Sequence, residues 1–105
     1  MFDNISPSEM RELVKQDENA VLIDVRSPEE CDEGMIEGSV NINLFDPSFM
    51  AEIGKLDKSK NYYMICRSGN RSSTACGAMA QMGFGKLYNL SGGMMAWDGE
   101  VVFPK

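Results

Sequence analysis

Hydrophobic positions along the chain fall mostly into short runs that suit β-strands. Residues 20–23 and 62–65 form unbroken apolar runs, which are typical of strands buried on both faces of a parallel sheet. Residues 40–44 alternate apolar and polar side chains with the period of two that a half-buried strand shows. Residues 2–5 and 87–90 are further short segments that begin and end with an apolar residue. The pattern predicts a strand at each of these places.

Helix starts appear between the runs as serine–proline pairs. Ser6 is the predicted N-cap of the first helix, with proline at the first helical position and Glu9 as the acid of a capping box. Met10, Leu13 and Val14 follow with helical spacing, so we expect them to form one buried apolar face.

The remaining helices are predicted from similar signals. Ser27, again followed by proline, begins a second helix, and residues 47–53 form a short third one. A longer helix is expected from Ser72, and a last short helix follows the glycine pair 92–93 and carries Trp97 as a packing residue. The longer helix has an apolar face and a C-terminal glycine: Ala75, Ala78, Met79, Met82 and Gly83.

Strands that alternate with helices define the expected fold class. In 105 residues this order favours a single α/β domain over residues 1–105, with a mainly parallel sheet. Ligands of such sheets bind at the carboxyl ends of the strands.

Charge and composition exclude several functions. The net charge is −6, whereas nucleic acids and anionic membranes attract basic surfaces, so we expect neither as a partner. No apolar run approaches the roughly 20 residues that span a bilayer. The three cysteines are an odd number, and no apolar leader precedes the first helix. We therefore expect a cytoplasmic protein without disulfides, and a monomer.

The chain contains no histidine. This excludes histidine-based catalytic triads and most zinc sites, and Cys31, Cys66 and Cys76 are too far apart for a metal knuckle. No metal or cofactor is expected. Cys31 and Cys76 are interpreted as small, half-buried side chains. The many methionines are interpreted as core residues, and the acids between residues 29 and 33 as a solvated face.

The candidate chemistry lies in the segment that begins at Cys66. A cysteine at the end of a buried strand, a short loop with Gly69 and then a helix start can direct backbone N–H groups at an anion. The same field favours the thiolate of Cys66, so this nucleophile is activated without imidazole. A plain buried cysteine in a βα turn is the alternative, but Arg67 and Arg71 beside it favour an anion site.

The predicted site therefore has one nucleophile and a set of binding residues. Cys66 is the candidate catalytic residue. The candidate substrate-binding residues are the six that follow it: Arg67, Ser68, Gly69, Asn70, Arg71 and Ser72.

The sequence resembles the rhodanese family over nearly its whole length. Residues 24–30 (Asp-Val-Arg-Ser-Pro-Glu-Glu) and 34–42 resemble the family's first motif, residues 66–72 (Cys-Arg-Ser-Gly-Asn-Arg-Ser) its active-site loop, and residues 92–97 (Gly-Gly-Met-Met-Ala-Trp) its closing motif. One departure is Met35, where the family usually has histidine. That position is not catalytic in the family, so only local packing is affected.

The resemblance implies a five-stranded, mainly parallel sheet with helices on both faces. It also implies a sulfurtransferase, in which Cys66 takes a sulfane sulfur from a small anionic donor such as thiosulfate or a persulfide. The sulfur then passes to cyanide, a thiol or a protein acceptor. Asp24 and Arg26 match structural positions of the family, and we expect Asp24, at a strand end, to orient backbone donors near the loop.

Two other functions remain open from the sequence. Related folds include phosphatases and arsenate reductases, whose loop places an arginine after five intervening residues. Here Arg71 arrives one residue early, and Ser72 takes that place. The domain could instead be a persulfide carrier that delivers sulfur to a protein with little turnover of small molecules.

Overall fold

The computed structural model describes residues 2–104. Five strands and five helices alternate along this part of the chain. The strands are β1 (Asp3–Ile5), β2 (Ala20–Asp24), β3 (Val40–Asn41), β4 (Asn61–Ile65) and β5 (Lys86–Leu90). The helices are α1 (Pro7–Gln16), α2 (Pro28–Cys31), α3 (Phe49–Gly54), α4 (Asn70–Gln81) and α5 (Gly93–Ala96).

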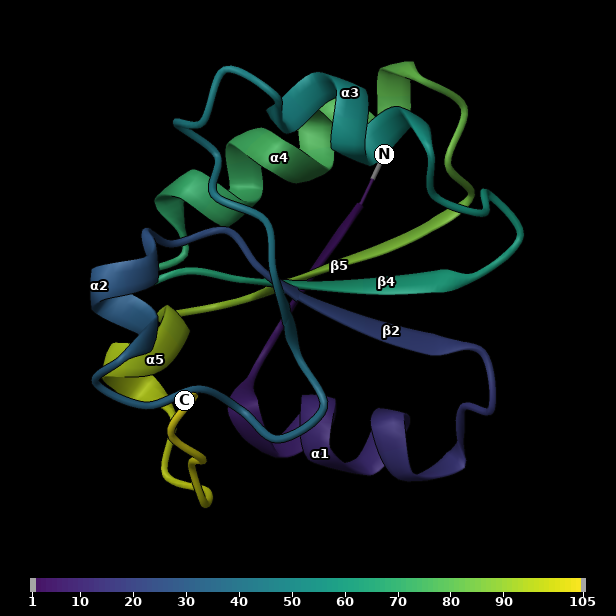
Figure 1. The fold of residues 1–105 in the computed structure, drawn as a ribbon. Helices are drawn as coiled ribbons and strands as arrows, with labels where there is room; N and C mark the ends of the chain where they lie inside the picture. Colours follow the sequence, from purple (N-terminus) through teal and green to yellow (C-terminus); the bar gives the residue numbers. More distant parts are fainter. Residues whose placement is uncertain (1, 105) are drawn as a thin grey trace.

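The strands form one sheet in the order β1-β5-β4-β2-β3. Every neighbouring pair is parallel, with Leu22 opposite Tyr63 and Tyr63 opposite Tyr88 in the central strands. Helices cover both faces: α3 and α4 lie on one side of the sheet and α1 on the other (Figure 1). The predicted α/β class, with a five-stranded parallel sheet between helices, is confirmed.

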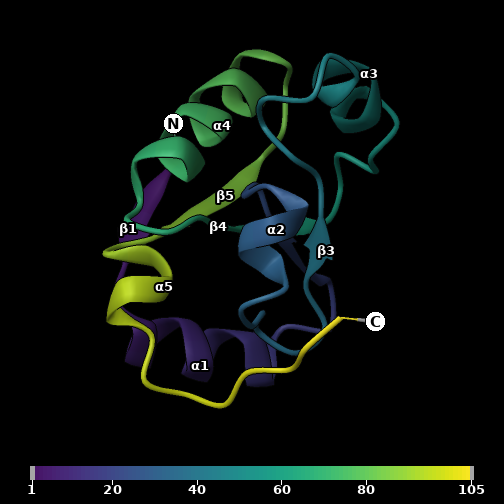
Figure 2. The same ribbon diagram turned by 60° about the vertical axis from the view of Figure 1, so that its left-hand side comes forward.

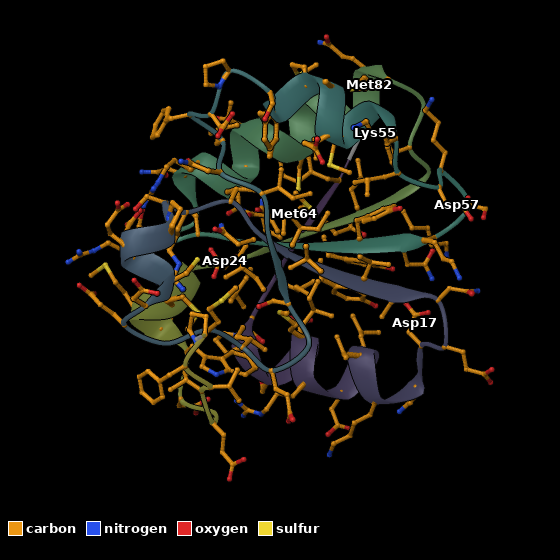
Figure 3. All side chains as sticks on the ribbon, viewed as in Figure 1. Asp17, Asp24, Lys55, Asp57, Met64 and Met82 are labelled. Carbon is orange, nitrogen blue, oxygen red and sulfur yellow. The ribbon has the colours of Figure 1, made fainter. Side chains whose placement is uncertain are left out.

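Each face of the sheet has its own hydrophobic core. Met64 of β4 packs with Ile53 and Met79 beneath α3 and α4, and its side chain lies in that layer in Figure 3. On the α1 side, Ile65 and Met10 share a second core. Successive residues of β4 thus point to opposite faces and are buried on both, as the unbroken apolar run predicts.

Most helix starts follow the prediction, and three details differ. Both serine–proline pairs form complete capping boxes, at Ser6 and Ser27. In α1, Leu13 is 39% exposed, so the apolar face is narrower than predicted. Helix α4 begins at Asn70, before the predicted Ser72, because the preceding loop turns tightly at Gly69. Strand β3 ends at Asn41, although Ile42 N–H still donates to the Asp24 carbonyl at 3.0 Å.

The packing role expected for Trp97 is confirmed, and Met35 is packed as well. Met35, the departure from the family pattern, is buried and pairs through its backbone with Val102 at 2.8 Å in both directions. Trp97 follows α5, packs against the core on the α1 side and lies under the guanidinium of Arg11, 5.5 Å from the ring centroid.

The carboxyl ends of the strands define one edge of the sheet. Helices α2 and α5 both lie at this edge, beside the start of α4 (Figure 2). The segments that follow β2 and β4 therefore meet there, which is where ligands of parallel sheets bind. Within residues 2–104, no helix has the length and apolar character needed to cross a membrane.

Candidate active site

Cys66 directly follows β4 and lies at the bottom of a tight loop. Its side chain is fully buried, and the loop turns back over it because Gly69 adopts φ +99°, a backbone conformation that side chains disfavour. The turn brings the amide N–H of Gly69 to 3.0 Å from Cys66 Sγ, to which it donates. The loop itself thus supplies a donor for a thiolate.

The hydrogen-bond donors around Cys66 Sγ affect its pKa more strongly than burial does. Burial raises the pKa of the Cys66 thiol. Hydrogen bonds from the Ser72 side chain and from the backbone of Ser72, Gly69 and Ser68 together lower it by more, so the pKa lies below its ordinary value. The Ser72 hydroxyl lies 3.2 Å from Sγ. The loop therefore favours the thiolate of Cys66 without a basic side chain.

The start of α4 adds to this field. The N-cap of the helix is Gly69, and no side chain caps the helix N-terminus. The first-turn N–H groups of this 12-residue helix remain available to an anion at the loop, together with the positive end of the helix dipole.

Asn89, near the end of β5, holds the cysteine loop in place through hydrogen bonds. Its amide Nδ2 donates to the Gly69 carbonyl at 3.1 Å and to Asn4 Oδ1 at 2.9 Å. Its Oδ1 is an acceptor for the Ser72 hydroxyl, whose single proton it shares with Cys66 Sγ. Asn89 was not among the predicted site residues, because its only signal in the sequence is a polar residue inside an apolar strand.

Helix α5 holds the loop from the other side. The amides of Met94 and Met95 donate to the carbonyls of Cys66 and Arg67 at 2.8 and 3.0 Å. A Cβ on Gly93 would lie 2.3 Å from the Cys66 carbonyl oxygen, so only glycine permits this approach. The glycine pair seen in the sequence thus closes the cysteine loop.

The two arginines of the loop have different surroundings. Arg67 is exposed, as are Ser68 and Asn70, so these three form the outer rim. Arg71 is half-buried and forms two hydrogen bonds of 2.7 Å with the carboxylate of Glu30. The interpretation of Glu30 as part of a solvated acidic face is therefore wrong, because this pair and the capping box hold it.

Asp24 and Arg26 form a buried ion pair behind the loop. Asp24 accepts hydrogen bonds from the Arg26 backbone and guanidinium, the shortest at 2.7 Å. The guanidinium also donates to the carbonyls of Glu30 and Gly34. Asp24 accepts from one backbone donor, the N–H of Arg26, and the ion pair fixes the α2 segment that carries Glu30.

The other two cysteines are more buried than predicted. Cys31 and Cys76 are 2% and 0% exposed, and both are free thiols. Burial is the main cause that raises the pKa of Cys31 to about 11 and that of Cys76 to about 12. Of the three thiols, Cys66 alone has its pKa lowered. Within residues 2–104, no three potential metal ligands cluster.

A shallow hollow of about 300 Å³ adjoins the loop. Its lining is half charged and half apolar: Arg26, Glu30, Glu33, Gly34, Arg67, Met94, Met95 and Val101. The hollow lies between α2 and α5, at the carboxyl edge of the sheet. A small molecule bound there would lie beside the cysteine loop.

These features define an α/β protein with a cysteine held in a cradle of hydrogen-bond donors at the carboxyl edge of a parallel sheet. The model of the family "Rhodanese-like domain" matches residues 6–100. The chain belongs to this family.

Named relatives agree with this assignment. The chain is 46% identical over 96 residues to "Putative sulfurtransferase YtwF" of Bacillus subtilis, which covers 91% of this chain and 90% of the relative. It is 34% identical over 98 residues to a "Sulfurtransferase" of Allochromatium vinosum, covering 92% and 89%. The crystal structure of a rhodanese-like domain protein from Staphylococcus aureus superimposes with a TM-score of 0.86 at 24% identity, over 99% of this chain and 100% of that one. The relatives support a sulfurtransferase-type function at the level of the family.

Proposed function

We propose that Cys66 accepts a sulfane sulfur from a small donor, holds it as a persulfide and passes it to a thiophilic acceptor such as a thiol or cyanide. The observation that carries this proposal is the cradle around Sγ, with the Gly69 N–H at 3.0 Å and the Ser72 hydroxyl at 3.2 Å. In the first step the thiolate attacks the outer sulfur of the donor, and the donor's S–S bond breaks with its electron pair on the leaving group. No cofactor is required.

The cradle suits each stage of such a cycle. The donors that stabilise the thiolate of Cys66 can also stabilise the anionic outer sulfur of the persulfide. In the second step an acceptor thiolate attacks that outer sulfur, and Cys66 leaves again as a thiolate. We assign catalysis to Cys66, donor binding to the loop from Arg67 to Ser72, and structural support to Asp24 and Arg26.

A phosphatase function is disfavoured by the orientation of Arg71. Such an enzyme needs an arginine that clamps the phosphoryl oxygens in the transition state. Here Arg71 is one residue early and binds Glu30 with both terminal nitrogens, at 2.7 Å each. The exposed loop residues Ser68 and Asn70 provide no carboxyl group for a leaving alkoxide.

Delivery of the sulfur to a protein thiol is the second candidate function. Phe45 and Met95 are 73% and 70% exposed, and each lies beside an arginine of the loop: Phe45 under Arg71, and Met95 bonded to the Arg67 backbone. Exposed apolar side chains next to a reactive group are typical of protein contacts. In this version the domain is a persulfide carrier with little turnover of small molecules.

We further propose that residues 1–105 act as a single domain, as a monomer, in the cytoplasm. The three buried free thiols suit a reducing compartment.

Intact-protein mass spectrometry tests the function. After incubation with a sulfane donor, the protein should gain the mass of one sulfur atom and lose it again when a thiol or cyanide is added. Cys66→Ser should abolish the gain, whereas Cys76→Ala, which removes a buried thiol outside the loop, should retain it. An adduct that survives Cys66→Ser would contradict the proposal.

A further inference from the structure

We infer that Val101 is a specificity-determining residue, which limits the size of the acceptor that can take sulfur from Cys66. The inference rests on the proposed function and adds to it a residue far from the cysteine loop in the sequence. It is carried by the position of the C-terminal segment, residues 97–103, which forms part of the wall of the hollow beside the loop.

The C-terminal segment is held in place at both ends. It runs from α5 past α1 towards the chain that leads into β3 (Figure 2). Near its start the indole N–H of Trp97 donates to the Glu100 carbonyl at 3.1 Å. Near its end Val102 and Met35 exchange two backbone hydrogen bonds of 2.8 Å each. The segment is therefore a fixed wall, and the residues between these two anchors have defined positions.

Val101 and Val102 point to opposite sides of this segment. A Cβ on Gly34 would lie 3.1 Å from Val101 Cγ2 and 3.7 Å from the ring of Phe103, so these two alternate residues face Gly34. Val101 and Gly34 both line the hollow, whereas Val102 does not. The Val101 side chain therefore joins the C-terminal segment to the turn after α2 and closes this part of the hollow.

The hollow adjoins the cysteine loop on the side of α5. Arg67, the residue after Cys66, lines it, and so do Met94 and Met95. The amides of these two methionines donate to the carbonyls of Cys66 and Arg67 at 2.8 and 3.0 Å. A molecule that approaches the loop from this side shares a volume of about 300 Å³ with the Val101 side chain.

The second step of the proposed cycle depends on this room. The nucleophilic atom of the acceptor attacks the outer sulfur of the Cys66 persulfide, a new bond to that sulfur forms, and the S–S bond breaks with its electron pair on Cys66. Cyanide has no organic group to accommodate, whereas a thiol must place its carbon chain beside the loop. Side chains that line the hollow should therefore affect transfer to a thiol and leave transfer to cyanide nearly unchanged.

The acceptor step is tested in the full chain, with Cys66 first loaded from thiosulfate or inorganic polysulfide and then desalted. The rate constants for loss of this sulfur to cyanide and to reduced glutathione are followed by intact mass. Val101→Trp should slow transfer to glutathione at least about tenfold and change transfer to cyanide less than about twofold. Valine and tryptophan are both uncharged, so the difference reports on room and not on charge.

Val102→Trp is the matched control. Val101 and Val102 are 37% and 41% exposed in the same segment, but only Val101 lines the hollow. Val102→Trp should leave both rate constants within about twofold of the wild type. Val101→Ala, which enlarges the hollow, should transfer sulfur to glutathione at least as fast as the wild type does.

The outcomes separate this inference from the proposed function. Unchanged glutathione transfer in Val101→Trp, equal slowing by Val102→Trp, or equal slowing of cyanide and glutathione overturns the role of Val101, while sulfur transfer by Cys66 stands. A loss in Val101→Ala as large as in Val101→Trp also overturns it, because the valine would then bind the acceptor and not limit its size. If neither donor loads Cys66, the proposed function itself fails.

Discussion

Ser72→Ala should raise the pKa of Cys66. The Ser72 hydroxyl is 3.2 Å from Sγ and is the one side-chain donor among the groups that lower this pKa. A hydrogen bond to a charged group contributes about 1.5–3 kcal/mol, and one pKa unit corresponds to about 1.4 kcal/mol. Because the single proton of Ser72 is shared with Asn89 Oδ1, we expect the thiolate to lose an amount at the lower end of this range, about 1.5 kcal/mol, and the pKa to rise accordingly.

The titration can be followed by the ultraviolet absorbance of the thiolate, with Cys66→Ser as the blank. Cys31 and Cys76 do not interfere near neutral pH, since their pKa values are raised to about 11 and about 12. Ser73→Ala is the matched control, because the hydroxyl of this neighbouring helical residue does not contact the sulfur. If the Cys66 pKa is the same in Ser72→Ala and Ser73→Ala, the Ser72 hydroxyl does not stabilise the thiolate and the prediction is refuted.

Three further predictions concern the groups that hold the loop. Gly93→Ala should lower the free energy of unfolding in urea by about 3 kcal/mol, because its Cβ would lie 2.3 Å from the Cys66 carbonyl oxygen. Gly85→Ala, where nothing lies within 4 Å of the added Cβ, should be nearly neutral. Equal effects of the two substitutions would contradict the close approach of α5 to the cysteine loop. Asp24→Asn should lower the free energy of unfolding by about 3 kcal/mol, because it leaves the Arg26 charge buried and unpaired. A loss below about 1 kcal/mol would exclude a stabilising role of this ion pair. Hydrogen bonds from Arg71 lower the pKa of Glu30 from 4.5 to about 2, so Glu30 stabilises the fold above pH 4.5. The stability difference between wild type and Glu30→Gln should vanish as the pH falls from 4.5 towards 2, and a constant difference would contradict the ion pair.

Local sequence rules predicted the parts of this structure that depend on neighbouring residues. The capping boxes at Ser6 and Ser27 and the buried strand before Cys66 each follow from a few consecutive positions. The parallel class and the number of strands were also accessible, because the motif order resembles a known family.

The features that were missed depend on residues far apart in the chain. Glu30 and Arg71 are 41 positions apart, and Asn89 reaches Gly69 only because β5 lies beside β4. Composition and periodicity carry no information on such pairs. Leu13 was misjudged for a related reason: helical spacing gives the direction of a side chain but not the extent of the sheet beneath it.

The clamp by α5 has a consequence for biosynthesis. The cradle of Cys66 needs Gly93 and Met94 of α5 and Asn89 of β5, all of which the ribosome adds after Cys66. We therefore expect the hydrogen bonds that lower the pKa of this thiol to form only after β5 and α5 have docked on the loop.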